Sequence, residues 1–198
     1  MAVIQLTGVT EMREKHEKLK VYEFLYNRLP FSDTEKQEFR AMQRMEKLEA
    51  RFEIELARVK TQNMSIHWHT EMLIDSDYEI VNVLIVTDYC YYLFVLHDLA
   101  GEFYINPFNI LCRENHEAAL DLNRSERIYE MFRSQLIDEG KYQRPIILKY
   151  VMMNSGFRLQ GRRSELFLDV KNLPYYLKAI EHSAVIRKKN HHAASKKF

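Results

Sequence analysis

The chain has 198 residues, a net charge of +1, 46% hydrophobic residues and 29% charged residues. This length is typical of one domain that buries its core without disulfides or metal ions, and the composition is that of a globular protein. The small net charge gives the whole chain no electrostatic attraction to nucleic acid. No signal peptide and no uninterrupted apolar run of membrane length is recognisable, so we expect a cytoplasmic chain with no membrane partner.

The two cysteines, Cys90 and Cys112, do not form a CxxC pair. A zinc ribbon and a disulfide framework are therefore not expected. Cys90 lies in an apolar run, and we expect it to be buried as a small hydrophobic residue.

Two helices are predicted near the N-terminus. Apolar residues recur at helical spacing from Glu11 to Arg28, and Pro30 ends this segment. Ser32 or Asp33 can cap a second helix, which is expected from about Thr34 to Lys60. Its apolar positions favour one stripe packed on a sheet over a coiled coil, and they are Met42, Met45, Leu48, Phe52 and Leu56.

The apolar spacing changes to two from Ser65, where SIHWHTEML predicts an edge or half-buried strand. His67 and His69 are expected on its polar face, as solvated side chains rather than a metal pair, because the sequence supplies no third ligand. The next two segments, 80–87 and 90–97, are apolar on both faces and predict a hairpin covered on both sides. A short strand is expected at 102–105.

The second half of the chain alternates between helix and strand. We expect a helix from Glu114 to Leu136, a buried strand at PIILKYVMM, a turn-rich basic connection at NSGFRLQGRR and a short helix at VKNLPYYLKAIEHSA. The order of elements predicts an α/β fold in which a meander is followed by a crossover to a further strand.

Several phrases of the sequence, in this order, resemble the nuclease-related domain (NERD) family, a branch of the restriction-endonuclease-like PD-(D/E)xK superfamily. They are LPFSDTEKQEF, IVNVLIVTDYCYYLFVLHDLAGEFYI, NRSERIYEMF, PIILKYVMMNSGFRL and LPYYLKAI. The resemblance covers about Leu29 to Glu181. It implies a three-layer core in which helices flank a mixed sheet with a central hairpin, here extended by an N-terminal helix.

The resemblance also implies which positions form the catalytic site. The family's metal-binding aspartate corresponds to Asn82, and its Glu-x-Lys corresponds to Val95 and His97. The helix glutamine corresponds to Asp121, while the glutamate of the first core helix is retained as Glu49. The site is therefore mostly substituted.

The spacing of the hairpin agrees with this alignment. If Asp88 and Tyr89 form a tight turn, Thr87 pairs with Cys90, and counting back places Asn82 opposite Val95. His97 then lies two residues further on the same face of its strand. We interpret His97 as a strand-end residue hydrogen-bonded to a neighbour such as Glu49 or Asp121.

These substitutions alter the chemistry that the site can perform. Phosphodiester hydrolysis needs a metal that polarises the phosphate and supplies hydroxide, and Mg²⁺ is held by carboxylates. Asn82 offers one neutral oxygen and Val95 offers none. We therefore predict a catalytically inactive pseudo-nuclease with no cofactor. The alternative is an active DNA or RNA nuclease that binds Mg²⁺ or Mn²⁺ in a rearranged site of Glu49, His97 and Asp121.

A binding role remains for an inactive domain, with nucleic acid or protein as the partner. Residues 1–29 form the N-terminal helical extension, 30–184 the NERD-like domain and 185–198 a basic disordered tail. The extension is expected to contact a protein or a second copy of the chain through its apolar residues. DNA or RNA would be contacted through phosphate-type interactions by Arg158, Arg162, Arg163, Lys188 and Lys189.

Overall fold

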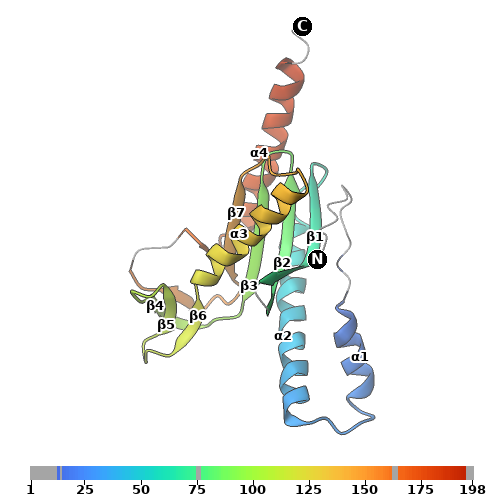
Figure 1. Ribbon diagram of the computed structural model, residues 1–198, viewed down its shortest axis with the longest axis vertical. Helices are drawn as coiled ribbons and strands as arrows, with labels where there is room; N and C mark the ends of the chain where they lie inside the picture. The colour runs from blue at the N-terminus through green and yellow to red at the C-terminus, as the bar shows by residue number, and fades with distance from the viewer. Residues whose placement is uncertain (1–12, 14, 75–76, 162–164, 195–198) are drawn as a thin grey trace.

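A computed structural model describes residues 13, 15–74, 77–161 and 165–194 as a mixed α/β fold with two sheets and four helices. The main sheet has the order β1-β2-β3-β7-β9 (Figure 1). Its strands are β1 (Met64–Ile74), β2 (Asp77–Thr87), β3 (Tyr91–His97), β7 (Ile146–Met152) and β9 (Phe167–Asp169). None of the helices in the described ranges is long and apolar enough to span a membrane.

Helices cover both faces of the main sheet (Figure 1). On one face lie α2 (Asp33–Leu56) and α4 (Leu173–Ala194), and on the other lies α3 (Asn123–Asp138). The N-terminus of α2 is fixed by a capping box, in which the Ser32 hydroxyl accepts from the Glu35 amide and the Glu35 carboxylate accepts from the Ser32 amide. The predicted cap at Ser32 is confirmed, and so is the single apolar stripe, which buries Leu48, Phe52 and Leu56.

The central hairpin has the predicted register. Val83 pairs with Phe94 and Val86 with Tyr91, and the Thr87 amide donates to the Cys90 carbonyl at 3.0 Å. The same count sets Asn82 against Val95. Beyond the hairpin, β3 and β7 are parallel, as expected for a crossover connection, and the side chain of Cys90 is buried.

The helix predicted from Glu114 is wrong over its first turns. The chain instead forms β5 (Ile110–Arg113) and β6 (Ala118–Asp121) before α3 begins. Asn109 and His116 adopt left-handed φ angles of 61° and 64°, and turns with such angles favour Asn and other short polar residues. With β4 (Gly101–Ile105) and β8 (Phe157–Leu159) these strands form a second sheet of order β6-β5-β4-β8.

The two ends of the chain also differ from the prediction. The first helix, α1, spans Glu17–Leu25 and packs against α2, where Leu19 is 1% exposed. The last helix extends to Ala194 and projects beyond the sheet (Figure 1), so residues 185–194 are helical rather than a disordered tail. The sequence has neither Gly nor Pro after Pro174, and nothing interrupts the helix.

Candidate functional site

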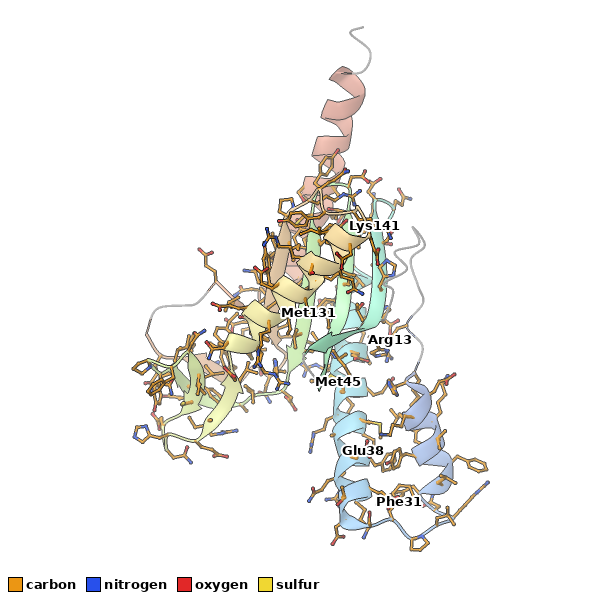
Figure 2. The ribbon with its side chains drawn as sticks, viewed as in Figure 1. Arg13, Phe31, Glu38, Met45, Met131 and Lys141 are labelled. Carbon is orange, nitrogen blue, oxygen red and sulfur yellow. The ribbon has the colours of Figure 1, made fainter. Side chains whose placement is uncertain are left out.

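A pocket of about 640 Å³ lies between α1, α2 and strands β1 to β3. Four of the five positions predicted for the catalytic site line it, namely Glu49, Asn82, Val95 and His97. In Figure 2, Glu38 lies on the part of α2 that runs beside α1, and Met45 lies on α2 nearer the sheet. The other lining residues are His16, Lys18, Leu19, Ala41, Met42, Met45, Glu46, His69, Ile80 and Leu96.

Glu49 is the centre of the polar contacts in this pocket. It lies on α2 and is 1% exposed. Its Oε1 accepts from Asn82 Nδ2 at 3.0 Å, and its Oε2 accepts from His69 Nε2 at 2.6 Å. Arg13 Nη1 lies 3.9 Å from the same Oε2. A buried carboxylate is tolerated when it is paired and hydrogen-bonded, and Glu49 meets that requirement within the protein.

Asn82 joins α2 to the central hairpin. Its Nδ2 donates to Glu49 and lies 3.1 Å from Met45 Sδ, while its Oδ1 accepts from the Leu96 amide at 2.8 Å. The Asn82 oxygen therefore accepts the hydrogen bond of a β3 backbone amide, just beyond the point where the pairing of β2 with β3 ends at Val83 and Phe94.

A local irregularity of β1 and β2 directs polar side chains toward α2. Val83 contacts the cluster beneath α2, whereas Val81, two residues earlier, contacts the cluster on the α3 side, so the alternation of faces breaks at Asn82. Opposite Asn82, His69 has a left-handed φ of 53°. This angle is uncommon for a residue with a Cβ, and it turns His69 onto Glu49.

The predicted pairing of His67 with His69 on one polar face is therefore wrong, and so is their solvated character. His67 is 6% exposed and lines a separate hollow with Thr87 and Tyr91. His69 lies on the α2 side with its side chain 22% exposed.

The residues of the pocket do not fit a magnesium ion. Mg²⁺ is usually held by carboxylate oxygens, with water and substrate completing an octahedron. Both oxygens of Glu49 already accept hydrogen bonds, the oxygen of Asn82 accepts from a backbone amide, and Val95 has no ligand atom. Val95 instead packs against the apolar cluster on the α3 side.

His97 ends β3 and differs from its interpretation as a hydrogen-bonded histidine. Its Nε2 is buried and has no hydrogen-bond partner among the described residues. Its ring lies 5.4 Å from that of Tyr150. Burial, together with the charge of Arg124, lowers the pKa of His97 from 6.5 to about 4. His97 is therefore neutral at physiological pH and supplies no cation in place of the lysine that the resemblance implies at this position.

Asp121, the fifth predicted position, lies outside the pocket at the end of β6. Its Oδ1 accepts from the backbone and side chain of Asn123, and its Oδ2 lies 3.6 Å from Arg127. These contacts fix the start of α3, so Asp121 acts in the turn rather than beside Glu49.

The predicted basic residues are only partly described. Arg158 lies on β8, and its Nη1 donates to the carbonyls of Ser155 and Phe157, each at 2.8 Å. Lys188 and Lys189 lie on α4. Arg162 and Arg163 lie outside the described residues.

Two contributors to the site were not predicted. Arg13, labelled in Figure 2, donates to Glu46 at 2.7 Å and to Glu53 at 3.0 Å. These bonds connect the N-terminal segment to α2. No periodic pattern marks it in the sequence. The contact of His69 with Glu49 depends on a single backbone angle that residue spacing does not encode.

Comparison with known proteins gave no match: no protein-family profile, curated protein or solved structure corresponds to the chain. A function is therefore inferred from the geometry of the pocket and from the topology of the sheet.

Proposed function

We propose that this chain is a restriction-endonuclease-like domain without hydrolytic activity, which acts as a binding module. The sheet supports the resemblance, because an antiparallel meander is followed by a helix and a parallel strand beside the hairpin. The main support for a loss of activity is the set of hydrogen bonds that Glu49 makes within the protein. Its two oxygens accept from Asn82 and His69, and among the described residues that line the pocket the only other carboxylate is Glu46.

The nearest carboxylate in the pocket, Glu46, accepts from Arg13 at 2.7 Å. The alternative of a rearranged nuclease receives no support from this geometry. It requires Asp121 beside Glu49 and His97, whereas Asp121 is engaged at the start of α3. Within the described residues, no group of three or more His, Cys, Asp or Glu side chains is arranged to hold a metal ion.

Of the two partner classes, protein has the better support. The guanidinium of Arg158 donates to its own loop, so part of its capacity for phosphate is used. The α1 region, in contrast, exposes apolar side chains: Val21 is 55% exposed, Phe24 60% and Leu29 54%. Exposed apolar groups gathered on one segment of the chain are typical of protein contact surfaces.

The proposal is tested by incubating the purified chain with DNA and RNA in Mg²⁺ and in Mn²⁺. We expect no cleavage by the wild type. The triple variant Asn82→Asp, Val95→Glu and His97→Lys restores the family's residues and should cleave in a metal-dependent manner. A band-shift assay with the same substrates at about 0.15 M salt should show no complex, since phosphate contacts weaken steeply with salt.

Wild-type cleavage that disappears in Glu49→Ala and His97→Ala, but persists in the surface variant Glu130→Ala on α3, would overturn the proposal. The wild-type measurement decides this point whether or not the triple variant folds, and circular dichroism establishes the folding of each variant.

A further inference from the structure

The N-terminal helix forms part of the pocket at the place where a nuclease of this fold would bind its nucleic-acid substrate. His16, Lys18 and Leu19 supply one wall of the pocket, and α2 and the sheet supply the others. The pocket volume of about 640 Å³ falls within the range of about 300–1,000 Å³ that is usual for small-molecule sites. A space of this volume suits a compact ligand.

The walls are largely apolar. The apolar lining includes Met42 and Met45 of α2, Leu19 of the N-terminal helix, and Val95 and Leu96 of β3. Methionine is flexible and polarisable, so it adapts to ligands of different outline. Transfer of an apolar molecule from water to such a surface is favourable by about 25 cal/mol for each Å² buried.

The charged groups Glu49, Glu46 and Lys18 of the pocket already have partners within the protein. Glu49 accepts from His69 and Asn82, Glu46 accepts from Arg13, and Lys18 is paired with Glu38. A charged ligand would lose its hydration on entry and would find each of these groups already engaged. A neutral ligand avoids that cost.

We propose that the pocket between α1, α2 and the central hairpin binds a neutral, largely apolar small molecule. The inference rests on the proposed function, because a working nuclease would have to admit an anionic backbone at this face. It adds the chemical class of ligand that the binding module accepts, and it gives the N-terminal helix a role as one wall of the site.

The full-length chain is titrated with two fluorescent probes that share one skeleton. N-phenyl-1-naphthylamine is neutral, and 8-anilino-1-naphthalenesulfonate carries an added sulfonate. We expect saturable one-site binding of the neutral probe, with the sulfonate weaker by about tenfold or more, because its charge stays unpaired in the pocket.

A matched pair of substitutions locates the probe. Met45→Trp fills the pocket and should weaken the neutral probe by about tenfold or more. Met131→Trp adds the same side chain on α3, where Met131 is 37% exposed and does not line the pocket, and it should change affinity by no more than about twofold (Figure 2). If Met45→Trp does not fold, Ala41→Trp, at an exposed position of the same lining, replaces it.

Three results would each overturn the inference: no binding of the neutral probe to the wild type, equal or tighter binding of the sulfonate, or equal effects of the two tryptophan substitutions. Absence of probe binding in a chain that also fails to cleave would refute the ligand class alone. Cleavage by the wild type would refute the proposed function, whatever the probes show.

Discussion

Two glutamates on one helix invite comparison. Glu38 and Glu49 are separated by about three turns of α2, and each accepts hydrogen bonds from two side chains. Glu38 is bonded to Lys18 and Tyr22 of α1, with its side chain 42% exposed. Glu49 is bonded to His69 and Asn82, with its side chain 2% exposed.

The difference in exposure decides what each cluster contributes. Around Glu38, water can replace any partner that is lost, and dissolved salt screens the ion pair, so the contacts orient α1 but stabilise the fold little. Around Glu49, a lost partner leaves a buried polar group without a hydrogen bond. The same residue type on the same helix thus fixes a surface contact in one place and the geometry of the pocket in the other.

Removing each glutamate should produce the largest contrast. Glu49→Ala leaves His69 and Asn82 without their shared acceptor, and we expect it to lower the free energy of unfolding by about 3 to 5 kcal/mol. Urea denaturation at pH 7 measures the change.

The control is Glu38→Ala, which should shift the denaturation midpoint far less, because its partners are solvated. Similar losses from the two variants would mean that burial does not distinguish the clusters.

Acidification should weaken the buried region more than the surface. The pKa of His97 is lowered from 6.5 to about 4 by burial and by the charge of Arg124, so the unfolded chain takes up a proton before the folded chain does. Stability contributed by neutral His97 is full above pH 6.5 and is lost as the pH falls toward 4. Between pH 7 and pH 4.5 this loss should be about 2 to 3 kcal/mol.

Carboxylates titrate over part of the same range, so the His97 contribution is taken as a difference. His97→Gln should flatten the pH dependence of the unfolding free energy relative to the wild type. His182→Gln, at an exposed position of α4, is the control for replacement of a histidine by glutamine. Parallel curves for His97→Gln and the wild type would contradict the prediction.

Salt should produce the smallest and most selective effect. Raising the salt concentration from about 0.1 M to 1 M shortens the Debye length from about 10 Å to about 3 Å. In double-mutant cycles followed by thermal unfolding, the coupling of Lys18 with Glu38 should fall to within error, while that of His69 with Glu49 should remain measurable. Equal loss of both couplings would show that solvent reaches Glu49.

Much of the main sheet follows from the sequence. Two apolar segments around a two-residue turn permit one register for β2 and β3, because a slip of one residue would exchange their faces. The hairpin of β5 and β6 does not follow in the same way. Residues 114–120 mix charged and apolar side chains in a pattern that a helix also accepts, and the left-handed backbone at Asn109 and His116 decides between the two.

The pocket was predictable to a similar degree. Register and helix packing bring Glu49, Asn82, Val95 and His97 to the lining of one pocket. The partners that occupy Glu49 were not predictable, since His69 reaches it through an irregular backbone angle and Arg13 comes from a separate segment with no periodicity. Asp121 was assigned to the site by the family resemblance. It lies instead at the end of β6, in a hairpin that the spacing of apolar residues did not predict.

The parallel pairing of β3 with β7 has a consequence for synthesis of the chain. Strands β1 to β3 can form from contacts between neighbours in sequence, but residues 98–145 must be made before β7 reaches the inner edge of β3. On the ribosome, that edge presents unpaired backbone groups with apolar side chains on both faces, which is a template for aggregation. The nascent protein is therefore most exposed to misassembly between the emergence of His97 and that of Met152.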